Sequence, residues 1–434
     1  MVDADQTFVI VGGGLAGAKA AETLRAEGFS GRVILICDER DHPYERPPLS
    51  KGYLLGKEER DSVFVHEPGW YAQNDIELHL GQTVDRVDRT AKTVRFGDDG
   101  TLVRYDKLLL VTGAEPRRLD VSGTDLVGVH HLRRLAHAER LKGVLQNLGR
   151  DNGHLVIAGA GWIGLEVAAA ARERGAEVTV IEPAPTPLHG VLGPELGNVF
   201  AQLHREHGVR FRFGVRLTEI VGQDGMVLAV RTDDGEEHPA HDVLAAIGAA
   251  PRTALAEAAG LELADRADGG GIAVDERLRT SDPDIYAAGD VASFPLSRFG
   301  TRLRVEHWGQ RAERRPGRGA RDAGQGSGLR PRALLLHRPV RPGHGVQRLG
   351  AARVVRRGGD PGRRRQAGVH RVLGEGGTRA GRDERERVGC HRSHPEADPG
   401  RGAGGPGGAG RPARTTRRPG AVTSGCSGTV TAAP

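Results

Sequence analysis

The fold is decided by TFVIVGGGLAGAKAAETLRAEG, residues 7–28, where a short apolar run leads into glycines and then into a mixed apolar and polar stretch. This order predicts a buried strand, a glycine turn and a helix from about Leu15 to Glu27. The turn has the spacing GxGxxG, formed by Gly12, Gly14 and Gly17. The first glycine permits a tight turn, the second lets the backbone approach a pyrophosphate, and the third lets helix and strand pack closely. The helix N-terminus then offers unpaired N–H groups to the anion.

An acidic pair follows the next strand-like run. RVILIC, residues 32–37, is followed by Asp38 and Glu39, which lie 21 and 22 residues after Gly17. An acid at this distance binds a ribose hydroxyl in dinucleotide folds. GxGxxG alone is common in ordinary turns, but the acid in this place favours a dinucleotide site.

The same design occurs again in HLVIAGAGWIGLEVAAAARERGAEVTVIEP, residues 154–183. Its pattern residues are Gly159, Gly161, Gly164 and, at the end of the second strand, Glu182. Two dinucleotide folds predict two dinucleotides. Glu182 favours NAD over NADP, because it would repel a 2′-phosphate and residues 183–186 contain no cation to offset it.

Composition divides the chain near residue 310. Residues 311–434 contain 27 arginines and 9 acidic residues, a net charge of +18, which leaves −12 for residues 1–310 out of the whole-chain +6. The same 124 residues contain no Lys, Ile, Asn, Phe, Tyr or Trp. The basic character therefore belongs to the tail, and the sequence predicts no specific nucleic-acid surface on the folded part.

Cysteine usage and hydropathy suggest a cytoplasmic protein. The cysteines are Cys37, Cys390 and Cys426, with no CxxC pair. The sequence shows neither an N-terminal apolar signal nor an 18-residue apolar run, so we expect a reducing compartment and no membrane association. No metal site is expected.

Three further motifs identify a family. RTSDPDIYAAGDVASF, residues 279–294, contains Gly289 and Asp290, and the strand ends LLLVTGAEPR (108–117) and VLAAIGAAPR (243–252) form a pair of glycine turns. Together with the two GxGxxG motifs, in this order, they resemble the FAD-dependent pyridine nucleotide oxidoreductases. The resemblance implies that Asp290 binds the ribityl chain of FAD. It also implies that the paired turns, with Gly248 on the NAD side, connect an FAD domain to an NAD domain.

The stretch YERPPLSKGYL, residues 44–54, indicates the branch of that family. Disulfide reductases of the superfamily carry a redox cysteine beside the flavin, but residues 39–66 contain none. PYERPPLSK resembles instead the ferredoxin reductases that serve Rieske dioxygenases and cytochromes P450. The two prolines stiffen the segment, and the resemblance places Lys51 near the flavin, paired with Glu166 as a buried ion pair. The alternative is an ordinary solvated lysine.

The resemblance also implies further cofactor contacts, residue by residue. On the FAD side these are Ala16, Asp38, Arg46, Pro48, Val84, Arg133 and Trp308, and on the NAD side Ile163. Val84 is better explained as a core residue than as a specific contact, and Arg133 has an alternative explanation as part of a basic connector with Arg134.

The tail has a second explanation beyond low complexity. The family continues with a third domain, which often forms its dimer. LLLHRPVRPGHGVQRL, residues 334–349, can be read one base out of frame as YFFTDQYDLGMEYSGW, which resembles the opening of that domain. We interpret residues 311–434 as this domain translated out of frame, the alternative being a genuine basic tail.

The sequence thus predicts an α/β protein with two Rossmann-like domains. An FAD domain occupies residues 1–118 and 245–310, an NAD domain 119–244, and the tail 311–434. The expected function is transfer of hydride from NADH to FAD and of single electrons to a small iron–sulfur ferredoxin. The alternatives are an NADH oxidase or quinone-type flavin reductase, and a nonenzymatic polyanion-binding protein.

Overall fold

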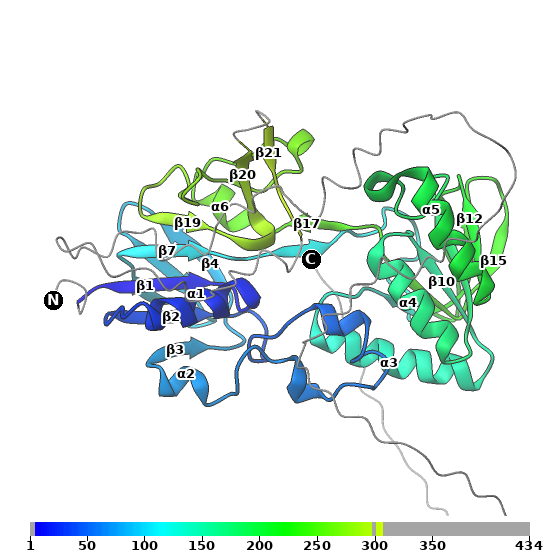
Figure 1. Cartoon of the computed structure of the whole chain (residues 1–434), viewed down its shortest axis with the longest axis horizontal. Helices are drawn as coiled ribbons and strands as arrows, with labels where there is room; N and C mark the ends of the chain where they lie inside the picture. Colours follow the sequence, from blue (N-terminus) through cyan, green and yellow to red (C-terminus); the bar gives the residue numbers. More distant parts are fainter. Residues whose placement is uncertain (1–4, 297–300, 307–434) are drawn as a thin grey trace, which may run out of the picture. The chain divides into compact units, whose positions relative to one another are not determined.

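The computed structural model describes residues 5–296 and 301–306, and two five-stranded parallel sheets dominate them (Figure 1). The first has the order β19-β7-β1-β2-β3, with β1 at Thr7–Val11, β2 at Arg32–Ile36, β3 at Ile76–His79, β7 at Lys107–Leu110 and β19 at Ile285–Ala287. The second has the order β12-β11-β10-β16-β9, with β9 at Val129–His130, β10 at His154–Ala158, β11 at Glu177–Glu182, β12 at Val209–Phe213 and β16 at Asp242–Ala245.

The two sheets follow one plan. In each, the strand before a glycine turn is central, the next two strands are added on one side, and a later strand is added on the other. We call the two repeats copies: the first runs from β1 to β7 with β19 added, and the second from β9 to β16. Each copy also carries an antiparallel three-stranded sheet at the same point of its sequence. These are β4 (Val84–Asp88), β5 (Thr93–Phe96) and β6 (Thr101–Arg104) in the first, and β13 (Leu217–Gln223), β14 (Met226–Thr232) and β15 (Glu237–Pro239) in the second. The repeat seen in sequence is therefore a repeat of structure, and the α/β prediction is confirmed.

The helices of the described residues, except the last, connect strands of the two parallel sheets. Their bounds are α1 Leu15–Ala26, α2 Trp70–Gln73, α3 Leu135–Arg150, α4 Trp162–Glu173, α5 His189–Glu206 and α6 Ala254–Ala258. The predicted first helix is found one residue shorter, with Glu27 as its C-cap. Its buried residues include Gly17, Ala18 and Ala21, whose small size lets the helix lie close to the sheet.

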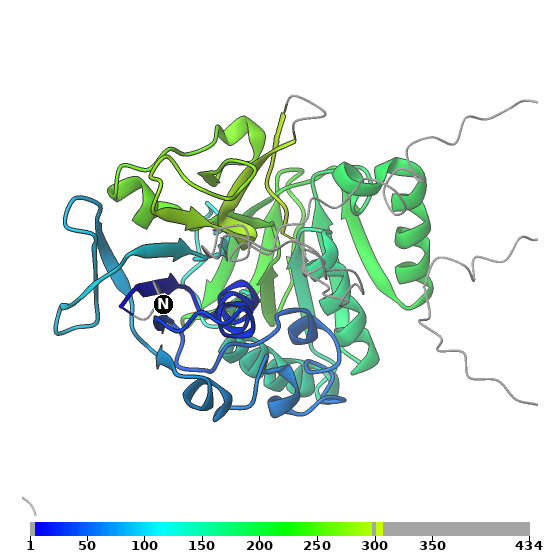
Figure 2. The same ribbon diagram turned by 60° about the vertical axis from the view of Figure 1, so that its left-hand side comes forward.

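The first sheet is buried on both faces, because alternate residues of its strands point to opposite sides. Val9 and Ile34 belong to one apolar cluster, with residues of the β4–β6 sheet and of the segment after residue 255. Phe8 and Leu35 belong to another, with α1. Figure 2 shows the yellow-green segment after residue 250 returning to the blue and cyan strands, where β19 pairs with β7.

The chain passes between the two sheets through a two-stranded ribbon. Its strands are β8 (Ala114–Pro116) and β17 (Ala249–Pro251), which run antiparallel. Gly113 and Gly248, before them, have positive φ values of +71° and +96°. The paired glycine turns predicted from the sequence therefore lie together, and each begins one strand of the ribbon.

Several short elements complete the described residues. They are the 3-10 turns η1 (Pro47–Ser50), η2 (Arg60–Val63), η3 (Arg266–Asp268) and η4 (Gly289–Val291), and the strands β18 (Ile272–Ala273), β20 (Ala292–Leu296) and β21 (Thr301–Leu303). Trp308 and the tail from Arg311 lie outside the described residues, so the predictions made for them remain predictions.

One excursion of the first copy packs into the second. Tyr44, Leu49, Tyr53, Leu54 and Val63 come from the segment between β2 and α2, yet they belong to the apolar cluster built by α3, α4 and the second sheet. Leu54 is fully buried there. The segment that carries the PPLSK motif is therefore held by both copies.

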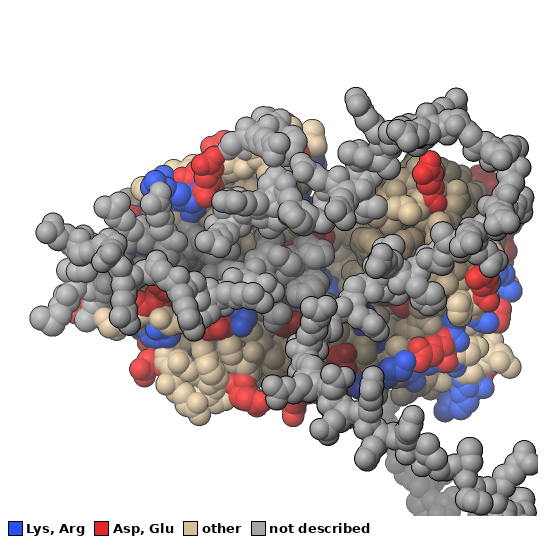
Figure 3. Space-filling model, viewed as in Figure 1, with Lys and Arg blue, Asp and Glu red and all other residues tan. Residues whose placement is uncertain are grey.

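Charges of both signs are mixed on the surface. On the face seen in Figure 3, basic side chains lie beside acidic ones over the described residues. Within the described ranges, no helix is both long and apolar enough to cross a bilayer.

Candidate functional site

The first glycine turn has the geometry that a dinucleotide requires. Gly12 has a φ of +123°, and a Cβ there would collide with the carbonyl oxygen of Val111. A Cβ on Gly17 would collide with the carbonyl oxygen of Gly12. Gly14, between them, has no heavy atom within 4 Å of a built Cβ. The first and third glycines are thus needed for packing, while the second leaves open space beside the backbone.

The second turn repeats this geometry residue by residue. Gly159 has a φ of +103°, and a Cβ on Gly164 would collide with its carbonyl oxygen. Gly161 again has nothing within 4 Å. In both copies the second glycine is also the N-cap of a 12-residue helix, and neither N-cap makes a side-chain hydrogen bond. Both helix N-termini can therefore donate N–H groups to an anion.

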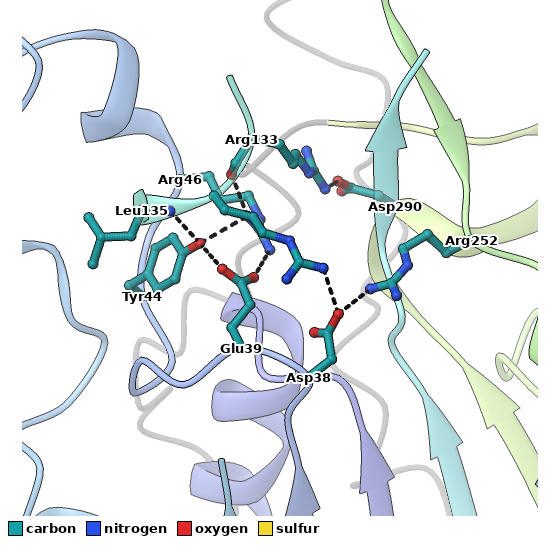
Figure 4. Close-up of polar contacts among 9 residues, drawn as sticks. Asp38, Glu39, Tyr44, Arg46, Arg133, Leu135, Arg252 and Asp290 are labelled. Atoms are coloured by element: carbon teal, nitrogen blue, oxygen red, sulfur yellow. Dashed lines mark hydrogen bonds and ion pairs between the residues drawn. The ribbon is translucent and has the colours of Figure 1, made fainter. Parts of the chain in front are cut away.

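Two arginines hold the first acid after β2 (Figure 4). Arg134 Nη2 donates to Asp38 Oδ2 at 2.7 Å, and Arg252 Nη1 donates to the same oxygen at 2.9 Å. Burial raises the pKa of Asp38, but the charges and hydrogen bonds of Arg252 and Arg134 outweigh it, so the pKa lies below its usual value. Asp38 is therefore ionised at neutral pH.

The second acid, Glu39, belongs to a separate network. Tyr44 Oη donates to Glu39 Oε2 at 2.5 Å, and Arg46 Nη2 donates to Oε1 at 2.9 Å (Figure 4). Tyr44 Oη also accepts the backbone N–H of Leu135 at 2.9 Å, at the start of α3. Both oxygens of Glu39 are thus used to fasten the segment before η1, whereas the two arginines on Asp38 bind only its Oδ2.

Asp290 and Arg133 form a further pair. Gly289 has a φ of +70°, and Asp290 Oδ2 accepts a hydrogen bond from Arg133 Nη2 at 2.7 Å. Arg133 Nε is buried and has no hydrogen-bond partner among the described residues. A buried donor of this kind requires an acceptor, and a cofactor oxygen would supply one.

The lysine of PPLSK reaches the second copy. Pro47 and Pro48 begin η1, and this turn places Ser50 and Lys51 against α4. Lys51 Nζ donates to Glu166 Oε2 at 2.8 Å, and Ser50 Oγ donates to the same oxygen at 2.5 Å. The expected pairing of Lys51 with Glu166 is present. The expected burial of the ammonium is not, because the Lys51 side chain is 53% exposed within the described residues.

Glu182 ends β11 and is held by backbone groups alone. Its Oε2 accepts the N–H of Ala160 at 2.7 Å, and its Oε1 accepts the N–H of Ala184 at 2.9 Å. These bonds fix the carboxylate beside the second glycine turn. A negative charge fixed there disfavours a 2′-phosphate.

A cavity of about 1040 Å³ connects most of these residues. Of the predicted site residues, those that line it are Gly12, Gly14, Ala16, Asp38, Arg46, Pro48, Lys51, Val84, Arg133, Ile163, Glu166, Gly289 and Asp290. Those that do not are Gly17, Gly159, Gly161, Gly164, Glu182 and Gly248. Val84 lines the cavity and also packs against the core, so both interpretations of it fit.

The cysteine near the cavity is unsuited to thiol chemistry. Burial raises the pKa of the Cys37 thiol to about 12, so it is not a thiolate at neutral pH. A built Cβ on Gly13 would come within 2.7 Å of Cys37 Cβ, so the side chain packs behind the glycine turn. In the described part of the chain, no cluster of His, Cys, Asp and Glu is arranged to bind a metal.

Three participants were not assigned roles from the sequence. They are Ser50, Arg134 and Arg252. The last two had a signal in hindsight, because Arg134 is adjacent to Arg133 at the start of α3 and Arg252 directly follows the second strand of the ribbon. For Ser50 there was no signal in the sequence beyond its place in the PPLSK motif.

Comparisons agree with this geometry. The family described as pyridine nucleotide-disulphide oxidoreductase matches residues 6–314. Rhodocoxin reductase of Rhodococcus erythropolis is 40% identical over 300 residues, which cover 69% of this chain and 68% of that protein. The biphenyl dioxygenase system ferredoxin–NAD(+) reductase component of Paraburkholderia xenovorans is 41% identical over 297 residues, covering 68% of this chain and 70% of that protein.

A solved structure extends the likeness to three dimensions. The crystal structure of the covalent putidaredoxin reductase–putidaredoxin complex matches with a TM-score of 0.66 and 37% identity, covering 70% of this chain and 72% of that chain.

Proposed function

Because this chain belongs to the pyridine nucleotide-disulphide oxidoreductase family, we propose that it is an NADH-dependent ferredoxin reductase with FAD as its cofactor. Its partner is a small iron–sulfur ferredoxin of the kind that supplies an oxygenase or a cytochrome P450. The enzyme class agrees with the relatives, whose names are those of ferredoxin reductases.

One observation carries the proposal. Two dinucleotide folds meet at the Lys51–Glu166 ion pair, where each copy contributes one side chain to the wall of a single cavity. Cofactors bound to the two copies would therefore approach each other at this pair. The described residues offer no reactive thiol there, since Cys37 is buried behind the first glycine turn.

The residues present fit FAD in the first copy. The N-terminus of α1 beside Gly14 suits a pyrophosphate, Asp38 suits a ribose hydroxyl, and Asp290 with Arg133 suits the polar chain between pyrophosphate and flavin. Bound FAD would supply the ability to accept a hydride from NADH and to release electrons singly.

The second copy and the junction would place the nicotinamide. Glu182 selects a nucleotide with a free 2′-hydroxyl, and Ile163 lines the cavity at the start of α4. Lys51 brings a positive charge to the junction, held in place by Glu166. Residues 1–118 and 245–310 would then form the FAD domain, and residues 119–244 the NAD domain.

We also propose that residues 311–434 are an out-of-frame translation. The 300 residues aligned with rhodocoxin reductase cover 68% of that protein, so about a third of it has no aligned counterpart here. The family match ends at residue 314, close to the composition break. Sequencing the coding DNA across codons 305–320 tests this. A single inserted or deleted base, relative to a frame that encodes the third domain, supports it. If correcting the reading frame leads to an early stop codon, the proposal is contradicted.

The function is tested by reduction of the purified chain. We expect a yellow protein that NADH bleaches anaerobically in preference to NADPH, and that then reduces an added iron–sulfur ferredoxin. Rapid NADH oxidation with O₂ or a quinone and no gain from ferredoxin would favour a flavin oxidase or quinone-type reductase. Salt-dependent polyanion binding in a chain that binds no FAD would favour the nonenzymatic alternative.

Replacement of Lys51 tests the junction. Lys51→Met should leave FAD bound and slow flavin reduction by NADH roughly tenfold to a hundredfold, because a charge beside the reacting groups is lost. Stopped-flow absorbance measures this rate. The control is Lys57→Met, because Lys57 also pairs with a glutamate of α4, Glu173 at 2.6 Å, but does not line the cavity. Equal rates of flavin reduction in the two variants would show that Lys51 has no role in the reaction.

A further inference from the structure

Asp38 takes two arginines on a single carboxylate oxygen, and Asp284 shows the contrasting arrangement. Both guanidinium groups, from Arg134 and Arg252, donate to Oδ2. Asp284 offers the contrast: Lys107 donates to its Oδ1 and Lys92 to its Oδ2, each at 2.5 Å. Asp284 has two cations on two oxygens, whereas Asp38 has two cations on one.

The arrangement leaves Oδ1 of Asp38 as an acceptor at the cavity. Asp38 and Arg252 both line the cavity, and the Asp38 side chain is 21% exposed. Asp284 does not line it. A carboxylate that is fixed through one oxygen keeps all acceptor sites of the other for a ligand hydroxyl, whereas one bound through both oxygens keeps fewer on each.

The two arginines are themselves held in place. The backbone N–H of Arg252 donates to the carbonyl of Gly113 at 3.0 Å, and its carbonyl accepts from Thr112 Oγ1 at 2.8 Å. Arg134 is the N-cap residue of α3, and the carbonyl of the preceding residue, Arg133, accepts from Arg46 Nη1 at 2.5 Å. The backbone that carries each arginine is thus anchored, at the start of α3 for Arg134 and directly after the ribbon for Arg252.

We propose that Arg134 and Arg252 are positioning residues for the adenosine end of bound FAD, which orient Asp38 so that Oδ1 accepts a ribose hydroxyl. The proposal rests on the proposed function, since it requires FAD in the first copy. It goes further because it makes retention of FAD depend on one side chain at the start of α3, in the second copy, and on one that directly follows the ribbon. The adenosine end is the part concerned, because Asp38 follows the strand next to the glycine turn.

The physical reason is geometric as much as electrostatic. A guanidinium donates along fixed directions, so two of them on one oxygen restrict rotation of the carboxylate. Each hydrogen bond from the ribose to an ionised acceptor is stronger than one to a neutral acceptor. Loss of either arginine should therefore weaken the hold on adenosine without altering the contacts of the isoalloxazine.

The test compares FAD with FMN, which has the same isoalloxazine but no adenosine. The full-length chain and its variants Arg134→Met and Arg252→Met are stripped of flavin, and dissociation constants for both flavins are measured by fluorescence quenching. We expect each variant to weaken FAD binding about five- to tenfold, a loss comparable to that of one ordinary hydrogen bond, and to leave FMN binding unchanged. Arg134→Lys and Arg252→Lys should recover part of the loss.

Lys92→Met is the matched control, because it removes one of two cations from a carboxylate outside the cavity. It should change neither affinity. Three outcomes would overturn the proposal. The arginine variants could weaken FAD and FMN binding equally, they could leave FAD binding unchanged, or Lys92→Met could have an effect as large as theirs. If a methionine variant does not fold, the lysine variants decide by the same two constants. A wild-type chain that binds no FAD overturns the proposed function itself.

Discussion

The two glycine-turn copies share a backbone plan but secure their acids differently. Asp38 is held by side chains 96 and 214 residues away in the chain, whereas Glu182 is held by backbone N–H groups 22 and 2 residues away. The acid of the first copy therefore depends on the tertiary structure around it. The acid of the second depends mainly on its own turn. Duplication of a fold can thus preserve the position of a charge while changing what controls it.

The largest effects on this comparison are expected from substitutions that disrupt the glycine turn of one copy at a time. Gly17→Val should abolish FAD retention and Gly164→Val should abolish reduction by NADH while FAD stays bound, because a side chain at either position collides with backbone. We expect each to lower the free energy of unfolding by roughly 1–3 kcal/mol, as for overpacking. Flavin absorbance after desalting and denaturant unfolding measure both effects.

Gly143→Ala is the control for these variants. Gly143 lies in α3 with nothing within 4 Å of a built Cβ, so alanine should be neutral or slightly stabilising. Loss of FAD in both valine variants alike would show that the copies do not bind separate dinucleotides.

A smaller effect is expected from removing one charge at a time. Glu182→Gln keeps an oxygen acceptor beside the second turn but removes the charge, so the preference for NADH over NADPH should narrow about tenfold, equivalent to about 1.4 kcal/mol. Asp38→Asn should leave that preference unchanged, because Asp38 belongs to the first copy. Steady-state kcat/KM with each nucleotide is the measurement. A preference that shifts equally in both variants would contradict the separate roles.

The smallest effect is a pH dependence. Since the pKa of Asp38 in the folded chain lies below its usual value, its ionisation stabilises the fold above the usual carboxyl range, and this contribution is lost as the pH falls towards the folded pKa. Asp38→Asn should therefore flatten the loss of stability below about pH 4, the ordinary range of an aspartate. Unfolding by urea at a series of pH values measures it, and parallel curves for the two proteins would contradict it.

Sequence reasoning was most successful where chemistry is local, or where a family motif implies the contact, as for Lys51 and Glu166, which are 115 residues apart. The turns at Gly12–Gly17 and Gly159–Gly164, the first helix and the pairing of Lys51 with Glu166 follow from spacing or from the family resemblance, and all are found. Their geometry is determined within a few residues or by a motif.

Long-range contacts could not be predicted in the same way. Arg252 and Asp38 meet only because the ribbon returns the chain to the end of β2, and no local pattern encodes that contact. The predicted burial of the Lys51 ammonium is likewise wrong, because side-chain burial depends on packing from several segments. The function of the site residues and the domain division remain predictions.

The excursion between β2 and α2 has a thermodynamic consequence. Tyr53 and Leu54, together with Tyr44, Leu49 and Val63, complete an apolar core whose remaining members belong to the second copy. Neither copy can then melt alone without exposing part of a core that it shares. The folded part of the chain should accordingly absorb heat in one cooperative transition, with equal calorimetric and van't Hoff enthalpies, even though its sequence contains two complete nucleotide folds.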